Sequence, residues 1–191
     1  MNLESAVVAM IVGLLRGGRI SNLGRIPFRG AYIFAVPLAC AIAASLLTHR
    51  AESEALTVTA TRIVNVMQYV VLLAAVAMNL HLRGMTIIGA GALSNFVALT
   101  VNRGVMPIDP TAAKTAGIWA LVDPDSGTKL IRHAIMTPDT RLGLLTDIIP
   151  IPIPKLATVL SIGDVLLAIG IFVLIQRYMR TPAAGDHLEK T

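Results

Sequence analysis

The carboxylate with the most unusual sequence setting is Asp164, which lies in the run Ser161-Ile162-Gly163-Asp164 within an apolar stretch of about residues 156–175. A charged side chain inside an apolar membrane helix costs roughly 2.5–3.5 kcal/mol on insertion scales, so it usually faces a partner or a water-filled cavity. Such a carboxylate could bind a proton, a cation or a polar headgroup. Two structural roles stay open: an ion pair that anchors a loop, or a capping box in which Ser161 is the N-cap and Asp164 completes the cap.

Six other polar residues lie in a long connection, about residues 102–155, that precedes this stretch. They are Asn102, Arg103, His133, Asp139, Arg141 and Asp147. Together with Asp164 and Ser161 they are the candidate ligand-binding residues, because a site needs convergent polar groups under an apolar cover. Arg103, Arg141 and His133 are the expected partners of Asp164, and an arginine can bind phosphate or carboxylate through two parallel hydrogen bonds. The alternative is that each arginine pairs with a neighbouring aspartate, as Arg141 would with Asp139.

Other kinds of chemistry are not predicted. The four histidines, His49, His81, His133 and His187, have no spacing typical of metal ligands, so no metal site is expected. The chain has no nucleophile elbow, phosphate-binding Gly-Lys-Ser/Thr loop or Cys-x-x-Cys motif, so we assign no catalytic residue and no cofactor, and an enzyme is not favoured. Four amides in or near apolar stretches are expected to form hydrogen bonds between helices: Asn65, Gln68, Asn79 and Asn95.

The elements that must position these residues are five apolar stretches. They span about residues 3–15, 31–48, 63–82, 85–101 and 156–175. A helix of about 20 apolar residues crosses a bilayer, and only 14% of this chain is charged, against about 25% in soluble domains. We therefore predict an all-α integral membrane bundle of about five transmembrane helices, formed by residues 1–180 as one domain, with residues 181–191 as a flexible cytoplasmic tail. The first stretch is short, so a re-entrant or interfacial helix is its alternative.

The basic residues predict the orientation of this bundle in a bacterial inner membrane. Loop 16–30 carries four arginines and no acid, the turn after the third stretch carries Arg83, and Arg177 and Arg180 follow the last stretch. Since Lys and Arg near short loops stay on the cytoplasmic side, the N-terminus is expected outside, the C-terminus inside, and the connection 102–155 on the outer face. The net charge of +5 is explained by this asymmetry and by anionic lipid, so nucleic acid is not a predicted partner.

The connection 102–155 is expected to be structured rather than free in water. Asp109-Pro110 predicts the start of a short helix that ends at Gly117. Thr137-Pro138 predicts a second helix start, and Asp123 to Gly127 predicts a turn. The apolar face of the second helix would be Leu142, Leu144 and Leu145, and an extended run is predicted by Pro150, Pro152 and Pro154.

Several of these segments resemble one known family. The segments are Arg16 to Arg19, Asn102 to Pro107, Thr137 to Pro150 and Ser161 to Leu167. In order and spacing they are similar to the bacterial membrane family catalogued as domain of unknown function 5317, over about residues 1–178. One departure is Thr146, which stands where the family's pattern leads us to expect glycine. The resemblance implies a bacterial multi-pass membrane protein and no known activity.

Three functions follow as hypotheses. The first is binding or transport of a small polar molecule or lipid headgroup at a pocket on the outer face, with membrane lipids as partners. The second is an accessory or scaffold subunit of a membrane complex, with another membrane protein or a second copy of the chain as partner. The third and weakest is a membrane-embedded enzyme that modifies lipids, because the sequence offers no catalytic pair.

Overall fold

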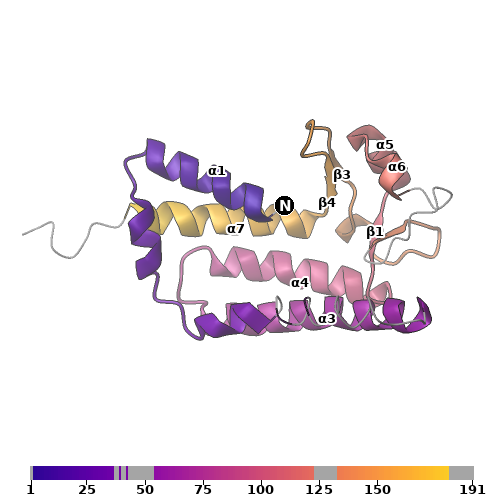
Figure 1. Cartoon of the computed structure of the whole chain (residues 1–191), viewed down its shortest axis with the longest axis horizontal. Coiled ribbons are helices and arrows are strands. Elements are labelled where there is room, and N and C mark those ends of the chain that lie inside the picture. Colours follow the sequence, from indigo (N-terminus) through magenta and orange to yellow (C-terminus); the bar gives the residue numbers. More distant parts are fainter. Residues whose placement is uncertain (1, 37–38, 40–41, 43–53, 123–132, 181–191) are drawn as a thin grey trace, which may run out of the picture.

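The computed structural model describes residues 2–36, 39, 42, 54–122 and 133–180 (Figure 1). The chain is mostly helical, and its four long helices run side by side: α1 (Asn2–Leu15), α3 (Glu54–Met78), α4 (Met85–Val101) and α7 (Ile162–Met179). The short 3-10 helices η1 (Ile20–Arg25) and η2 (Ala31–Phe34) lie at one end of the long helices, and most of the connection between α4 and α7 folds at the other end.

The closest helix pair is α4 and α7, which run antiparallel and meet through glycines. A Cβ added at Gly91 would lie 2.5 Å from the carbonyl oxygen of Gly163, and one added at Gly170 would lie 2.9 Å from that of Gly84. Small residues let two helix backbones approach this closely. Gly163 and Gly170 lie seven residues apart on one face of α7, and they meet Gly91 of α4 and Gly84, the residue that precedes α4.

α3 and α1 pack on either side of this pair. α3 and α4 share a core with α7 that includes Val76, Ile88 and Leu167. α1 lies along the C-terminal half of α7, where the Gln176 side-chain amide donates to the carbonyl of Ala9 at 2.6 Å. These contacts leave the start of α1 a short way past the first turn of α7 rather than beside its first residue (Figure 1).

The observed helix bounds confirm two predicted stretches and correct two. α1 and α4 agree with the stretches 3–15 and 85–101. The stretch 63–82 was predicted to end four residues too far along the chain, because α3 ends at Met78. The buried side chain of the next residue, Asn79, binds the backbone N and O of Arg29 at 2.7 and 2.9 Å. The stretch 156–175 was placed too early, since α7 begins at Ile162. Most of the stretch 31–48, like the tail 181–191, lies outside the described residues.

The prediction of an all-α fold is wrong for the connection, which contains strands. The strands β1 (Met106–Ile108) and β2 (His133–Ile135) pair in parallel, and β3 (Ile149–Ile151) and β4 (Thr158–Leu160) form an antiparallel hairpin. The other elements that the structure describes in the connection are α5 (Pro110–Ala116), α6 (Trp119–Val122) and the 3-10 helix η4 (Gly143–Leu145). The connection has a small core of its own, built from Ile108, Ala112, Ala113, Ala116, Val122 and Val159.

The local predictions within the connection have mixed outcomes. α5 is confirmed at both ends, because the Asp109 side chain accepts from the Ala112 N–H and Gly117 follows with a φ of 77°. The helix predicted from Thr137-Pro138 is wrong, because Leu142 adopts a φ of 51° that ends a turn and only η4 follows. The proline run is extended as predicted at Pro150, which lies in β3. The turn predicted at residues 123–127 lies outside the described residues.

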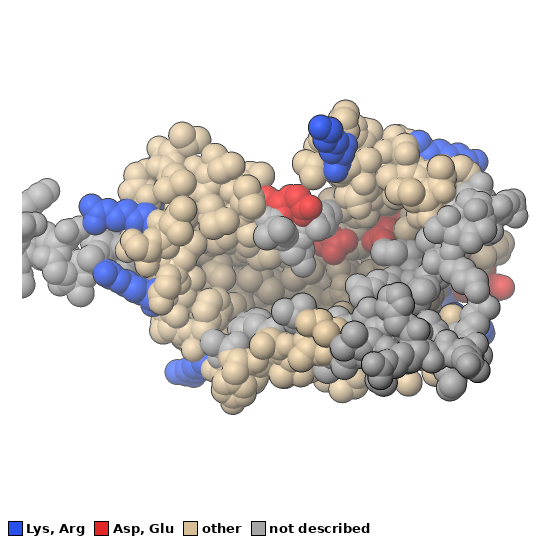
Figure 2. Space-filling model, in the orientation of Figure 1, with Lys and Arg blue, Asp and Glu red and all other residues tan. Residues whose placement is uncertain are grey.

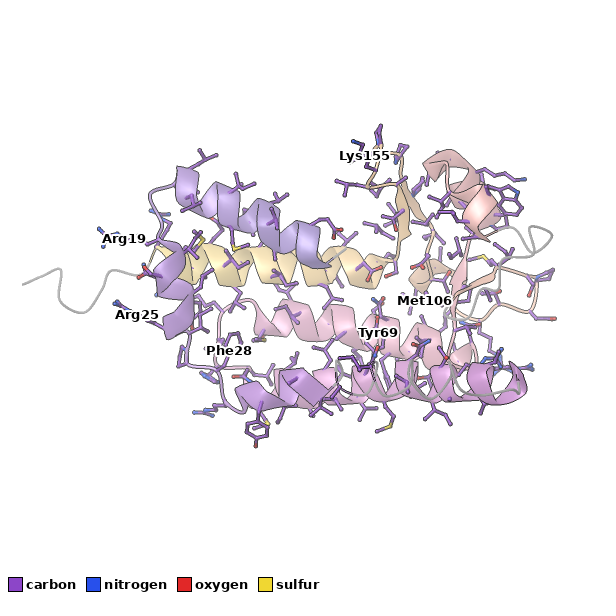
Figure 3. All side chains as sticks on the ribbon, viewed as in Figure 1. Arg19, Arg25, Phe28, Tyr69, Met106 and Lys155 are labelled. Atoms are coloured by element: carbon purple, nitrogen blue, oxygen red, sulfur yellow. The ribbon has the colours of Figure 1, made fainter. Side chains whose placement is uncertain are left out.

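Two of the described helices are long and apolar enough to cross a membrane, Val58–Met78 within α3 and Ile162–Met179, while Glu4–Leu15 and Met85–Val101 are shorter apolar helices. Among the described residues, length and composition therefore support two membrane-spanning helices and not the predicted five. Basic side chains gather at the end where α1 and α7 finish and also lie on the surface of the connection, while acidic side chains lie in the hollow at the centre of the view (Figure 2). Arg19 and Arg25 mark the basic end in Figure 3.

Candidate functional site

A small polar cavity lies where α3, α4 and the start of α7 meet the connection. Its volume is about 210 Å³, and it is lined by Asn65, Gln68, Tyr69, Leu99, Met106, Asp147 and Asp164. Figure 3 labels Tyr69 on α3 and Met106 on β1, which mark the position of the cavity near the first turn of α7. Five of its seven lining residues are polar although the helices around it are apolar, so it is the candidate site.

α3 supplies three neighbouring polar side chains to the cavity. Asn65, Gln68 and Tyr69 are spaced at i, i+3 and i+4, which places them on one face of a helix. The Asn65 side-chain amide donates to the carbonyl of Gly104 at 3.2 Å, which holds the loop after α4 against α3. The Tyr69 phenol lies near Asn95 of α4.

Asp164 enters the site as part of the cap of α7. The Asp164 backbone N–H donates to Ser161 Oγ at 2.9 Å, and the Ser161 N–H donates to Asp164 Oδ2 at 3.2 Å. This is a complete capping box, so the capping alternative is the correct one. Asp164 is therefore the third residue of α7. The predicted stretch 156–175 would have placed it eight residues inside a span, so Asp164 lies nearer the helix end than the sequence implied.

Asn95 of α4 links the cap of α7 to the neighbouring helix. Its amide donates to Asp164 Oδ1 at 2.9 Å, and its carbonyl oxygen accepts from Ser161 Oγ at 2.8 Å. Asn95 and Ser161 are both fully buried. Asn95 and Ser161 are therefore partners of Asp164. The side chains of Arg103 and Arg141, two of its expected partners, are instead exposed, and the side chain of the third, His133, lies outside the described residues.

Asp147 is brought to the cavity by the backbone of the connection. Its N–H donates to the carbonyl of Pro107 at 3.0 Å, and its carbonyl accepts from the N–H of Asp109 at 2.9 Å, so it is held beside β1. The residue is only 4% exposed. Thr146 before it has a φ of −89°, which any residue adopts, and its hydroxyl donates to the carbonyl of Gly143 at 2.7 Å. The backbone of this chain therefore does not need the glycine expected at that position.

Four of the remaining predicted site residues, all with described side chains, do not line the cavity. Asn102 forms a two-way pair with the backbone of Arg141, donating to its carbonyl at 2.9 Å and accepting from its N–H at 3.0 Å. The side chains of Arg103, Asp139 and Arg141 are exposed. His133 lies in β2 and pairs with Met106 through the backbone, while its side chain is outside the described residues. Of the eight candidates, the structure brings together Asp147, Asp164 and Ser161.

Sequence reasoning assigned part of this site to another role. The prediction of hydrogen bonds between helices is confirmed for Asn95, and Asn65 and Gln68 were named with it but not as site residues. Tyr69, Leu99 and Met106 were not singled out. The i, i+3, i+4 spacing of Asn65, Gln68 and Tyr69 is the signal that would have found the polar face of α3.

The arrangement is rich in groups that accept hydrogen bonds. Two carboxylates, Asp147 and Asp164, line one small cavity together with two amides and one phenol. Ionised carboxylates only accept, and they bind N–H donors that carry positive charge most strongly. In the described part of the chain, no three histidine, cysteine or acidic side chains form a group that could hold a metal ion.

The chain was compared with known proteins. It is 26% identical over 191 residues to an uncharacterized protein of Thermotoga maritima, an alignment that covers 98% of this chain and 99% of the relative. No solved structure gives a significant match. The model of the family of unknown function DUF5317 matches residues 25–176, a range that includes the cavity and leaves out the Arg16 to Arg19 segment. Because this match covers well over half of the sequence, the chain belongs to the family DUF5317.

Proposed function

We propose that the chain is a multi-pass bacterial inner-membrane protein that binds a small, positively charged polar molecule in the cavity beside Asp147 and Asp164. The observation that carries the proposal is the convergence of these two carboxylates, from separate segments of the chain, on one cavity of about 210 Å³ between apolar helices. Carboxylates accept hydrogen bonds, and they bind N–H donors that carry positive charge most strongly. Binding is also the step that transport of the same molecule would require.

The exposed apolar surface supports the membrane part of the proposal. α1 exposes Val8 at 56% and Leu15 at 83%, and α3 exposes Ile63 at 58% and Met67 at 48%. Contiguous apolar surface of this kind is unfavourable in water and typical of a membrane or protein contact. We propose five spans: α1, residues 31–48, α3, α4 and α7. α4 has 17 residues, which is the short end of the spanning range, and α1 is shorter, so it crosses only where the bilayer thins.

The basic end supports the proposed orientation, with the N-terminus outside and the C-terminus in the cytoplasm. The Arg19 N–H donates to the carbonyl of Met179 at 2.9 Å, so the loop after α1 lies against the end of α7. Arg29 is joined to Asn79 at the end of α3. The three basic segments therefore share one end of the bundle, as the positive-inside rule requires of cytoplasmic segments. The connection and the cavity lie toward the opposite end, which faces outward in this proposal.

Cysteine labelling tests this orientation. Cys40 is the single cysteine of the chain, so Cys40→Ala provides a background for Gly24→Cys and Leu144→Cys. A Cβ at Gly24 meets nothing within 4 Å, and Leu144 is 75% exposed, so neither change should disturb the fold. We expect a membrane-impermeant maleimide to label Leu144→Cys in intact cells and Gly24→Cys only after permeabilisation. Labelling of both positions from the same side would overturn the topology.

The size and lining of the cavity define the class of ligand. A volume of about 210 Å³ is below the roughly 300–1,000 Å³ of pockets that hold drug-sized ligands, so the ligand has few non-hydrogen atoms. Two carboxylates and the amide and phenol oxygens favour a donor with several N–H groups. A small primary ammonium compound fits these requirements, and methylammonium is the simplest probe.

Ligand binding is tested by thermal unfolding of the purified protein in detergent. We expect methylammonium chloride to raise the melting temperature above that in sodium chloride at equal ionic strength, since a ligand at 100 times its Kd adds about 2.7 kcal/mol to stability. Asp147→Asn should abolish the difference because it removes one carboxylate from the cavity. Asp139→Asn is the matched control, as this aspartate is exposed on the same connection. An equal difference in both variants, or none in the wild type, would contradict the proposal.

A further inference from the structure

One buried donor at the end of the bundle that carries the connection has no acceptor. The Nε atom of Arg62 in α3 is buried and has no hydrogen-bond partner among the residues that the structure describes. Buried polar groups are almost always hydrogen-bonded, so such an exception points to a partner outside the chain. Arg62 is also the one charged residue of the apolar segment Val58–Met78. A charged side chain in a segment of this kind marks a functional site by default.

The turn that follows α4 covers Arg62 and carries a second arginine. A Cβ added at Gly104 would lie 2.8 Å from the Arg62 Cβ and 3.0 Å from its carbonyl oxygen, so the two backbones are in contact. Arg103 precedes this glycine with a φ of 61°, a conformation that is strained for residues with a Cβ. An arginine therefore stands beside Arg62 where glycine would fit with less strain. Strained residues of this kind cluster at ligand-binding sites.

A third arginine is fixed to the same turn. The Asn102 side chain donates to the carbonyl of Arg141 at 2.9 Å and accepts from its N–H at 3.0 Å. The backbones of Arg103 and Arg141 are therefore joined through one residue, and both side chains are exposed. The turn at residues 102–104 thus brings three arginines to one place at the end of α4.

The membrane topology does not explain this cluster. α4 starts at the basic end and finishes at the connection, so the three arginines lie in the part that faces outward in the proposed orientation. The positive-inside rule accounts for basic residues on the cytoplasmic side only. The C-terminal end of α4 offers about half of one negative charge, which is small beside three guanidinium groups. A bound anion would supply the rest.

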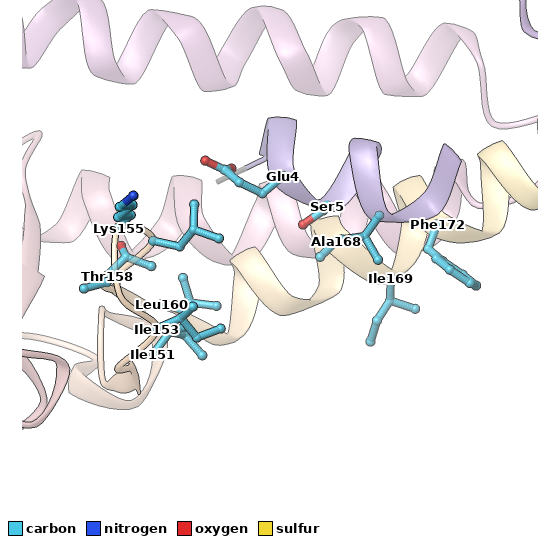
Figure 4. A pocket seen from close by; sticks show the side chains of 13 residues that line it. Glu4, Ser5, Ile151, Ile153, Lys155, Thr158, Leu160, Ala168, Ile169 and Phe172 are labelled. Atoms are coloured by element: carbon cyan, nitrogen blue, oxygen red, sulfur yellow. The ribbon is translucent and has the colours of Figure 1, made fainter. Parts of the chain in front are cut away.

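The cluster is separate from both concavities of the fold. Asn65 of the polar cavity follows Arg62 by one turn, but side chains on a helix lean toward its N-terminus, and none of the three arginines lines that cavity. The other concavity is an open groove of about 680 Å³ between α1, the β3–β4 hairpin and α7 (Figure 4). Its described lining is mostly apolar, and Lys155 is the basic residue within it.

We propose that Arg62, Arg103 and Arg141 form a binding site for the phosphate group of an anionic molecule at the outer end of the bundle. A guanidinium group binds phosphate through two parallel hydrogen bonds. Binding of this kind through Nε and one Nη gives the Arg62 Nε–H its acceptor. The phosphate belongs either to a lipid headgroup of the outer leaflet or to a free phosphate compound. The site does not depend on the cationic ligand proposed for the polar cavity.

Thermal unfolding of the full chain in detergent tests the site, with inorganic phosphate as the probe. We expect phosphate to raise the melting temperature more than sodium chloride at equal ionic strength. Because phosphate also stabilises proteins by exclusion from their surface, the decisive quantity is the difference between variants. Arg62→Lys keeps the charge but removes the Nε–H and the planar fork, so the apparent Kd for phosphate should rise about tenfold, the effect of one charged hydrogen bond. Arg83→Lys, at an exposed arginine of the basic end, is the matched control and should respond as the wild type does.

Arg103→Gly gives a second and independent test. Glycine adopts the positive φ of this position without strain, so the melting temperature without phosphate should equal or exceed that of the wild type. The response to phosphate should nevertheless weaken about tenfold, because one guanidinium group is lost. A full response in both Arg62→Lys and Arg103→Gly, or none in the wild type beyond that in chloride, would overturn the proposal.

The source of the phosphate is identified by repeating the measurement with lipid. Phosphatidylglycerol is compared with diacylglycerol of the same acyl chains, which lacks the phosphate. A larger rise with phosphatidylglycerol than with diacylglycerol, weakened in Arg62→Lys, would assign the phosphate to a lipid headgroup. A response to inorganic phosphate with equal effects of the two lipids would assign it to a free phosphate compound.

Discussion

Gly163→Ala is expected to lower the free energy of unfolding by about 3 kcal/mol, the upper part of the range for overpacked sites. The new Cβ would collide with Asn95 Oδ1 and would lie 2.7 Å from the carbonyl oxygen of Gly91. Neither atom can move aside easily, because one is fixed by hydrogen bonds and the other belongs to the backbone of α4. The helices α4 and α7 must therefore separate, and the contact at Gly84 and Gly170 is expected to loosen with them.

Chemical denaturation in detergent, followed by the helical circular dichroism signal, measures this loss. Gly24→Ala is the matched control, because a Cβ at that position meets no atom within 4 Å and the backbone has no positive φ. We expect the control to unfold within about 0.5 kcal/mol of the wild type, as for surface substitutions. Equal stability of Gly163→Ala and Gly24→Ala would show that the α4–α7 contact is not as close as described.

The second large effect is expected for Asn95→Ala, at about 2–3 kcal/mol of lost stability. The side chain of Asn95 is fully buried and bonds both Asp164 and Ser161. Its removal leaves the Asp164 carboxylate without its partner on α4 and the Ser161 hydroxyl without its acceptor. A buried group that loses its partner costs more than an average hydrogen bond, because its desolvation is no longer offset.

Ser94→Ala on the same helix is the control for this experiment. The Ser94 hydroxyl oxygen is buried with no hydrogen-bond partner among the described residues, so its removal should leave stability unchanged or slightly raised. The comparison is made by the same denaturation measurement. If Asn95→Ala were as stable as Ser94→Ala, the hydrogen bonds across the α4–α7 interface would contribute no net stability.

The parts of the fold that could be predicted are those controlled by neighbouring residues. The stretch 85–101 was predicted closely from its apolar composition, and the helix α5 from its end signals, Asp109-Pro110 and Gly117, which act within one turn. The alternative cap at Ser161 and Asp164 was recognised for the same reason. The helix expected after Pro138 failed because the left-handed backbone of Leu142 has no signal in the residue type.

The parts that could not be predicted depend on residues distant in sequence. Asp164 was recognised as unusual, but its partner Asn95 is 69 residues away and belongs to a helix that the sequence does not place beside α7. The pairing of β3 with β4 converts a proline-rich run into a hairpin, which shifts the start of α7 to Ile162. Charge alone suggested Arg103 and Arg141 as site residues, yet neither side chain reaches the cavity, because the loops that carry them hold them at the surface.

The central contact of the bundle also sets the order in which the protein can be completed. α4 ends at Val101 and α7 begins at Ile162, so a growing chain must add the whole connection before the partner of α4 is made. Chains lengthen by about 5–20 residues per second during synthesis, which gives the connection several seconds to form its own core before α7 emerges. The amide of Asn95 and Gly91 on α4 therefore have no partner on α7 until α7 has been synthesised. The polar cavity is accordingly a product of the final assembly step, and a nascent chain that stops before Ser161 cannot contain it.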